Sequence, residues 1–227
     1  MTELRTRPVA AIVVAAGSGS RLGHGRPKAL VAVGGVPMVR RSVDVLRSAG
    51  VGHIVVVAHP GHLDQFRAAL LGVTDLTIVS GGSERPESVR NGLDEVDAPM
   101  VLVHDAARPL VPLRVVEAVM QALAEGAQAV IPVVPVIDSI RRVQDDGSAV
   151  VDRADLRAVQ TPQGFATDVL RAGHRHIQEH GIAVTDDASA CELVGAPITF
   201  VEGDREAMKI TEPLDLVLAE AMWQARS

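Results

Sequence analysis

The sequence has little of what several classes of protein depend on. It contains no tyrosine, and aromatic residues make up 2% of its 227 residues. Single-stranded nucleic acids are bound largely by stacking on aromatic side chains, and the net charge of −6 comes with no basic tail. Cys191 is the only cysteine, which excludes an intramolecular disulfide framework. We therefore expect no nucleic-acid partner and a cytoplasmic location.

Long apolar runs are also missing. Hydrophobic residues make up 47% of the chain, yet no run approaches the roughly 18 residues that span a membrane. The segment "PVAAIVVAAG" (8–17) follows Arg5 and Arg7 and could imitate a signal peptide. It is short, rich in β-branched residues and leads directly into a glycine-rich loop, which favours a buried strand. We expect no association with a membrane.

Short apolar runs alternate with helical patterns along most of the chain. Helices are predicted near 37–50, 63–71, 87–96 and 112–126, and buried strands at 10–16, 53–59, 76–82, 100–105 and 128–134. This alternation predicts an α/β fold with a doubly wound, mostly parallel, Rossmann-like sheet. Ligands bind beyond the carboxyl ends of such strands, so the loops at 17–28, 81–88 and 105–108 should line one crevice.

One region interrupts the alternation. Residues 136–165 contain two strand-like arms around Asp146-Gly147, a strong hairpin signal. We interpret it as a hairpin arm, at about 136–160, inserted in a single domain of residues 1–227. Beyond it, the pattern predicts helices near 167–180, 186–194 and 212–224, and a strand at 198–203.

The loop "AAGSGSRLGHGRPK" (15–28) is typical of a phosphate site. It does not fit the dinucleotide fingerprint, because Leu22 replaces the third glycine and His59 stands where a ribose-binding acid is expected. It is not a P-loop either, because His24 rather than lysine follows Gly23. What remains is a glycine-rich backbone that can approach phosphate oxygens, followed by Arg21 and Lys28. This combination predicts phosphoryl chemistry, in which positioning and charge neutralisation do most of the catalysis.

Six motifs, spread nearly end to end, resemble the 2-C-methyl-D-erythritol 4-phosphate cytidylyltransferase family of the sugar nucleotidyltransferase superfamily. They are the loop at 15–28, "GGSERPESVRNGL" (81–93), "VLVHDAARP" (101–109), "VDRADLRAVQTPQGF" (151–165), "TDDASA" (185–190) and "EGDREAMKIT" (202–211). The resemblance implies transfer of a cytidylyl group from CTP to methylerythritol phosphate, with release of pyrophosphate, in the non-mevalonate pathway of isoprenoid synthesis. It also implies Mg²⁺ as a cofactor, and the metal ligands stay open.

The resemblance implies a role for particular residues. Arg21 and Lys28 would stabilise charge at the α-phosphorus of CTP, while Arg153 and Lys209 would grip the methylerythritol phosphate. The residues expected to bind CTP are Ala15, Ala16, Gly17 and Ser18 at the phosphates and ribose, Gly81, Gly82 and Ser88 at cytosine, and Asp105 and Ala106. The residues expected at the second substrate are Asp105, Arg108, Ser139, Arg153, Thr185 and Lys209. Asp105 could instead hold Mg²⁺ through water, and Thr185 could simply cap a helix.

Three further expectations concern assembly, alternative functions and the histidines. In the family the arm reaches across a two-fold homodimer, so Arg153 and Ser139 would act in the neighbouring subunit's site. The alternatives are a ribitol-5-phosphate cytidylyltransferase or a non-catalytic nucleotide-binding module. His174, His176 and His180 are interpreted as a solvated helix surface rather than metal ligands, because positions 174 and 176 do not share a helix face.

Overall fold

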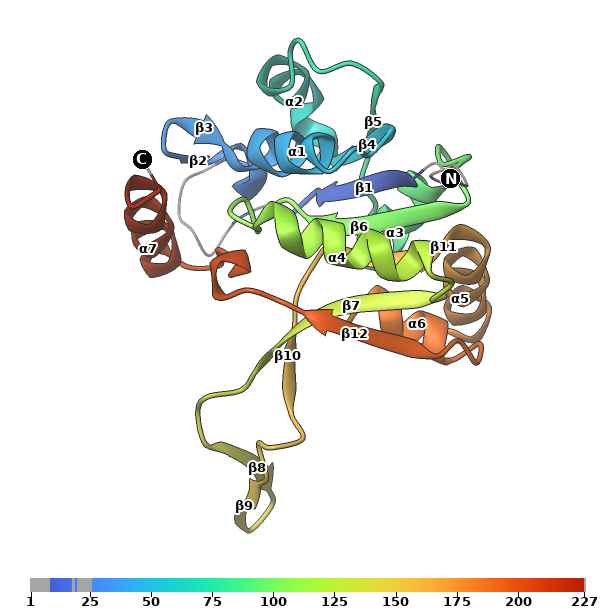
Figure 1. Cartoon of the computed structure of the whole chain (residues 1–227), viewed down its shortest axis with the longest axis vertical. Helices are drawn as coiled ribbons and strands as arrows, with labels where there is room; N and C mark the ends of the chain where they lie inside the picture. Colours follow the sequence, from blue (N-terminus) through green and yellow to red (C-terminus); the bar gives the residue numbers. More distant parts are fainter. Residues whose placement is uncertain (1–8, 18, 20–25, 227) are drawn as a thin grey trace, which may run out of the picture.

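The computed structural model describes residues 9–17, 19 and 26–226. An eight-stranded sheet runs through it in the order β10-β7-β11-β6-β1-β4-β5, and β12 pairs with β7 (Figure 1). These strands are β1 (Val9–Ala15), β4 (His53–Ala58), β5 (Leu76–Ser80), β6 (Met100–Asp105), β7 (Ala129–Pro135), β10 (Arg157–Val159), β11 (Gln163–Ala166) and β12 (Ile198–Glu202). The helices are α1 (Met38–Ser48), α2 (Leu63–Ala69), α3 (Arg85–Leu93), α4 (Leu113–Ala124), α5 (Thr167–His180), α6 (Asp187–Glu192) and α7 (Pro213–Gln224).

The sheet is mostly parallel, as predicted. Strand β1 is parallel to β4 and β6, β4 to β5, and β12 to β7. Only β10 and β11 run antiparallel to their neighbours. The sequence did not predict these two, because strands of three or four residues contain too few positions for a recognisable pattern. Helix α3 begins at Arg85 rather than near Glu87, since Pro86 is favoured in the first turn.

Helices cover both faces of the sheet. Alternate residues of β1 point to opposite sides, so Ala11 and Val13 pack with α1, α2 and α4, whereas Ala10 and Ile12 pack with α3, α5 and α6. A strand buried on both faces must be apolar throughout, which explains the continuous hydrophobic run. No helix in the described part of the chain has the length and apolar character needed to span a bilayer.

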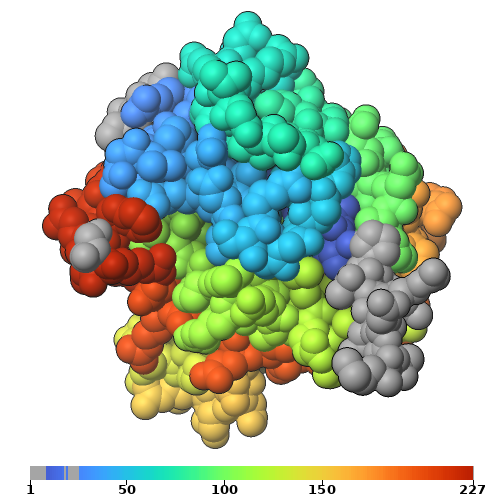
Figure 2. Space-filling view, turned by 45° about the horizontal axis from the view of Figure 1, so that its top comes forward, coloured from blue at the N-terminus to red at the C-terminus, as the bar shows by residue number. Residues whose placement is uncertain are grey.

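A smaller core joins α7 to the N-terminal third of the chain at one end of the molecule (Figures 1 and 2). The short hairpin of β2 (Ala32–Val33) and β3 (Val36–Pro37) packs there, after the turn η2 (Lys28–Leu30). The Gly34 N–H donates to Glu220 Oε1 at 2.9 Å, and the Arg41 guanidinium lies 3.5 Å from the centre of the Trp223 ring. Ile210 belongs to the same core, which therefore fixes the segments that carry Lys28 and Lys209.

The predicted arm leaves the sheet after β7 and returns to it as β10. Between them β8 (Ile140–Gln144) and β9 (Gly147–Val151) form a separate hairpin that projects away from the body (Figure 1). Gln144 pairs with Gly147, so the turn is Asp145-Asp146, and the predicted turn at Asp146-Gly147 was wrong by one residue. Gly147, with φ of 147°, is the first residue of β9, because the Asp-Gly signal marks the exit of this turn.

Candidate active site

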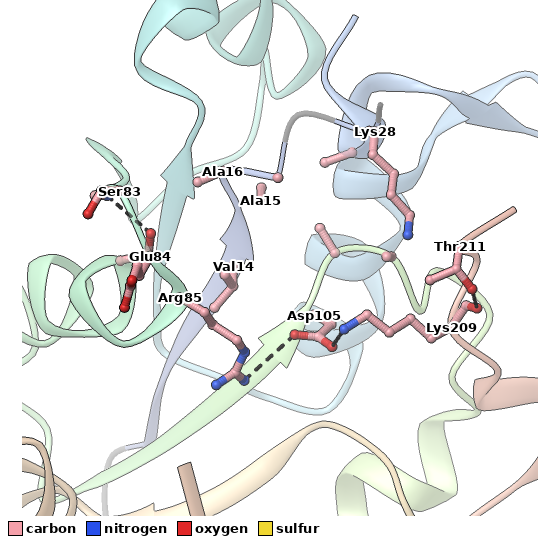
Figure 3. Close-up of a pocket in the computed structure, with 17 residues that line it drawn as sticks. Val14, Ala15, Ala16, Lys28, Ser83, Glu84, Arg85, Asp105, Lys209 and Thr211 are labelled. Atoms are coloured by element: carbon pink, nitrogen blue, oxygen red, sulfur yellow. Dashed lines mark hydrogen bonds and ion pairs between the residues drawn. The ribbon is translucent and has the colours of Figure 1, made fainter. Parts of the chain in front are cut away.

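A cavity of about 330 Å³ lies at the carboxyl ends of β1 and β6 (Figure 3). Residues from the loops predicted to share a crevice line it, together with the segment that precedes α7. They include Ala15, Ala16, Gly17 and Lys28 of the first loop, Gly82 and Ser88 of the second, Asp105 and Ala106 of the third, and Lys209 and Thr211. The sheet thus gathers residues far apart in the chain, as the strand order predicts.

The glycine-rich loop folds back onto Lys28. Gly19 has φ of 72°, and a Cβ added to it would lie 2.9 Å from both Cβ and backbone N of Lys28, so a side chain is excluded there. Lys28 follows Pro27, which precedes η2, and its ammonium group points into the cavity (Figure 3). Ser18 and Arg21, both predicted at this loop, lie outside the described residues.

The second loop presents backbone rather than bulky side chains. The Gly82 N–H donates to Ser88 Oγ at 3.1 Å. Gly81 does not line the cavity; a Cβ added to it would lie 2.3 Å from the Cβ of Ala16. The missing side chain at Gly81 therefore lets the second loop pack directly against the first.

Asp105 is the buried carboxylate at the floor of the cavity, with 7% of its surface exposed. Lys209 Nζ lies 2.8 Å from Oδ2, Arg108 Nε lies 4.0 Å from the same oxygen, and Arg85 Nη2 lies 3.7 Å from Oδ1. Burial alone would raise the pKa of Asp105, but Lys209, Arg85 and Arg108 together lower it to about 2. Asp105 is therefore a carboxylate at neutral pH.

His104, the residue before Asp105, helps to hold the end of β6 in place. Its ring is fully buried, and Nδ1 lies 3.0 Å from Thr161 Oγ1, which also accepts the backbone N–H of Asp105 at 3.0 Å. Burial lowers the pKa of His104 to about 4, so the imidazole is neutral at physiological pH. Thr161 thereby joins a neutral ring to the backbone of the charged residue.

Four predicted substrate residues lie outside the cavity of their own chain. Arg108 donates to the carbonyl oxygens of Ala207 at 2.7 Å and Val159 at 3.3 Å, which ties two segments together. Ser139 and Arg153 are exposed on the arm, where Arg153 donates to the carbonyl of Ile137. Thr185 is exposed as well. Its alternative role as a helix cap was wrong, because Asp186 caps α6 by accepting the N–H of Ser189 at 3.0 Å.

Sequence reasoning missed a row of charged groups behind Asp105. Arg85 lines the cavity and also lies 2.7 Å from Asp187 Oδ2, and Asp187 Oδ1 lies 3.0 Å from His174 Nε2. The interpretation of His174 as helix surface was wrong, since 2% of it is exposed. The signal was present: Leu170, His174 and Ile177 are spaced as one buried helix face. No cluster of three or more His, Cys, Asp or Glu suited to a metal occurs among the described residues.

The arrangement suits the binding and reaction of phosphate compounds. Two lysines reach one cavity, glycine-rich backbone forms part of its walls, and its buried carboxylate, Asp105, is already paired with cations. Such a site stabilises developing negative charge through fixed cations and dipoles.

Comparison with known proteins gives the family. A family model described as 2-C-methyl-D-erythritol 4-phosphate cytidylyltransferase matches residues 9–225. A protein of that name from Frankia casuarinae is 52% identical over 218 residues, covering 94% of this chain and 80% of the relative. The crystal structure of the Thermus thermophilus enzyme of the same name has a TM-score of 0.81 and 35% identity, covering 96% of this chain and 99% of that one. The 4-diphosphocytidyl-2C-methyl-D-erythritolsynthase of Anaerococcus prevotii has a TM-score of 0.86 and 26% identity over the same shares. The motifs, the doubly wound fold and these matches agree, and this chain belongs to the 2-C-methyl-D-erythritol 4-phosphate cytidylyltransferase family.

Proposed function

We propose that the cavity at β1 and β6 is where this chain transfers a cytidylyl group from CTP to 2-C-methyl-D-erythritol 4-phosphate. The products are 4-diphosphocytidyl-2-C-methyl-D-erythritol and pyrophosphate, and the reaction belongs to the non-mevalonate pathway of isoprenoid synthesis. Family membership makes the chain a cytidylyltransferase that uses CTP as co-substrate. The observation that carries the assignment of the site is that Lys28, Lys209 and Asp105 line one cavity with the backbone of the glycine-rich loop.

The reaction needs cations more than it needs a base. The second pKa of a phosphate monoester is near 6, so its attacking oxygen is already largely ionised at neutral pH. That oxygen forms a bond to the α-phosphorus of CTP, and the bond to the leaving pyrophosphate breaks with its electron pair. Asp105 has a pKa of about 2 and is a poor proton acceptor, which is in keeping with a mechanism that uses no general base.

We assign the nucleotide to the side of the cavity formed by the first two loops. The backbone of Ala15, Ala16 and Gly17 would hold the phosphates and ribose, with Ser18 and Arg21 contributing from the same loop. Lys28 would neutralise charge at the α-phosphorus. Gly82 and Ser88 would contact cytosine, with Gly81 keeping the two loops close. Asp105 and Ala106, at the end of β6, would face the ribose.

The alcohol phosphate is assigned to the opposite side. Lys209 would bind its phosphate, with Arg108 and Thr185 nearby. Arg153 and Ser139 are exposed on an arm that projects from the body of their own chain and do not line its cavity, so we assign them to the cavity of a second copy. This supports a homodimer in which each site is composite.

Mg²⁺ fits the site as an ion bound mainly to the triphosphate rather than as one coordinated by protein ligands alone. The described residues offer no cluster of three metal ligands, whereas Asp105 provides one carboxylate in the cavity. Magnesium sites commonly combine one or two carboxylates with substrate phosphates and water. Asp105 would hold the ion through water, and the ion would shield the charge of the triphosphate.

The single cysteine agrees with a cytoplasmic location, which we infer for this enzyme. Cys191 is buried in α6, and burial raises its pKa to about 12. The thiol is therefore protonated and unreactive, and it plays no part in the proposed reaction.

The direct test is pyrophosphate release by the pure protein with CTP, Mg²⁺ and methylerythritol phosphate. Parallel reactions replace the alcohol phosphate with ribitol 5-phosphate, and calorimetry measures CTP binding. We expect turnover with methylerythritol phosphate and at most weak turnover with ribitol 5-phosphate. Tight CTP binding without turnover of either alcohol would instead identify a non-catalytic binding module.

A further inference from the structure

Arg85 is placed between two carboxylates at the wall of the cavity. It is the first residue of α3, and 29% of its side chain is exposed. Its Nη2 atom lies 2.7 Å from Asp187 Oδ2 and 3.7 Å from Asp105 Oδ1 (Figure 3 shows the contact with Asp105). Arg85 is thus held firmly by one carboxylate while it faces the other.

The carboxylate that holds Arg85 is itself immobilised. Asp187 is 1% exposed and lies 3.0 Å from Nε2 of the buried His174. Helices α5 and α6 pack closely here, because a Cβ added to Gly173 would lie 2.6 Å from the carbonyl oxygen of Ala190. Burial would raise the pKa of Asp187, but the hydrogen bond with His174 and the charge of Arg85 lower it. Asp187 is therefore a charged anchor with little freedom to move.

Lys209 has two anionic partners in the proposed reaction, Asp105 and the alcohol phosphate. Its ammonium group lies 2.8 Å from Asp105 Oδ2, yet the proposed function requires it to bind the phosphate of the alcohol substrate. When Lys209 turns to that phosphate, Asp105 loses its nearest cation while only 7% of it is exposed. Removing the nearest partner of a buried carboxylate is strongly unfavourable. The remaining cations must compensate: Arg108 Nε lies 4.0 Å from the oxygen that Lys209 uses, and Arg85 faces the oxygen that Lys209 does not use.

We propose that Arg85, anchored by Asp187 and His174, is a positioning residue that holds the Asp105 carboxylate in place while Lys209 binds the alcohol phosphate. Arg85 acts through Asp105 and Lys209 and takes no part in bond making. The inference rests on the proposed function, since it concerns the role of Lys209 in the same reaction.

The test compares Arg85→Gln, Arg85→Lys and the wild-type enzyme in steady-state kinetics. Arg85→Gln should lower kcat by about 10-fold, less than the factor of 10² to 10³ typical of a direct donor, and should raise KM for methylerythritol phosphate. Arg85→Lys keeps the charge and should recover part of the loss. The matched control is Arg171→Gln, because Arg171 of α5 also bonds α3 and its loop, at the carbonyls of Leu93 and Val96, but does not line the cavity. It should keep kcat and KM near wild type even if it unfolds at a lower temperature.

The kcat and KM values separate positioning from simple structural support. A loss of stability alone should affect Arg85→Gln and Arg171→Gln alike, whereas only Arg85→Gln should raise KM for methylerythritol phosphate, and Arg85→Lys should reverse part of that rise. If Arg85→Gln keeps the wild-type kinetics, the assignment is overturned.

A double-substitution cycle tests the anchor. Asp187→Asn removes the charge of the anchor directly. If that variant does not fold, His174→Leu is used instead, because it removes the partner of Asp187 and His174 does not line the cavity. If Arg85 acts through this anchor, Arg85→Gln/His174→Leu should be no slower than Arg85→Gln alone. Additive losses would overturn the anchoring role. Wild-type enzyme without turnover would refute the proposed function, whereas active wild type with an unaffected Arg85→Gln would refute only the role of Arg85.

Discussion

The cavity and the arm differ in whether their charged side chains form ion pairs within the chain. At the cavity, Asp105 is buried among Lys209, Arg85 and Arg108, and every partner comes from the same chain. On the arm, Arg153 and Ser139 are exposed, and Arg153 bonds only a backbone carbonyl within the arm. The carboxylate of the cavity is thus enclosed by side-chain cations, whereas Arg153 of the arm contacts backbone and solvent. The contrast is what the proposed homodimer requires, in which the arm would act at a second copy of the chain.

The largest effect should come from the cavity. Lys28→Ala should lower kcat by a factor of about 10² to 10³, because a cation aimed at the reacting phosphate is lost. The free energy of unfolding should change by less than about 1 kcal/mol, because Lys28 is only partly buried and its ammonium group faces the cavity. Pyrophosphate release and urea unfolding measure the two quantities. A large drop in the free energy of unfolding would show that Lys28 supports the fold, and its loss of activity could then not be compared with that of the arm variants.

Acid should lower the free energy of unfolding through His104, which precedes Asp105 in β6. The folded-state pKa is about 4, against 6.5 for the ordinary group, so the unfolded chain takes up a proton first as the pH falls. Stability is therefore fully present above pH 6.5 and should decrease by about 3 kcal/mol as the pH falls to 4. Urea unfolding of wild type and His104→Asn between pH 7 and 4 measures it. The variant should lose most of this dependence, and identical pH dependence in both proteins would refute the assignment.

Asp105 should make a further pH-dependent contribution to the free energy of unfolding, at lower pH. The pKa of Asp105 is depressed from 3.8 to about 2, so its share of stability is present above pH 4 and is lost as the pH falls toward 2. That share is about 2 kcal/mol.

The arm should affect substrate use with little effect on the fold. Arg153→Ala should raise KM for the alcohol phosphate by about 10-fold, the loss of roughly one charged hydrogen bond, and should leave the melting temperature unchanged. Mixing Arg153→Ala with Lys28→Ala chains is the sharper experiment. If the arm acts in the neighbouring subunit, mixed dimers contain one site with both residues and recover activity. Absence of recovery in proven mixed dimers would place Arg153 and Lys28 in the same chain's site.

The smallest effect is expected at Thr185. Its substitution by alanine should change KM for the alcohol phosphate by about threefold, within the range of one weak hydrogen bond. Stability should hold, because Asp186 caps α6. A loss near 1 kcal/mol, typical of a removed cap, would show that Thr185 supports the helix after all.

Much of the architecture was predictable because buried parallel strands are continuous apolar runs. Residues 100–105 were predicted as a strand and form β6 with those bounds, and the helix predicted near 167–180 is α5. The convergence of three loops on one cavity follows from strand direction alone. The short strands β10 and β11 escaped prediction, because pairing with β7 stabilises them more than any local preference does.

The sequence by itself determined the fold class, the family and the phosphate-binding loop, since each depends on local pattern or on motifs in order. Only the tertiary structure brought Arg85, Asp187 and His174 together, because they come from three separate helices and no spacing rule connects them. It also separated Lys209 from Arg153, both of which the motifs assign to one phosphate. Electrostatic partnership is decided by distance and burial, and neither can be read from the order of residues in the chain.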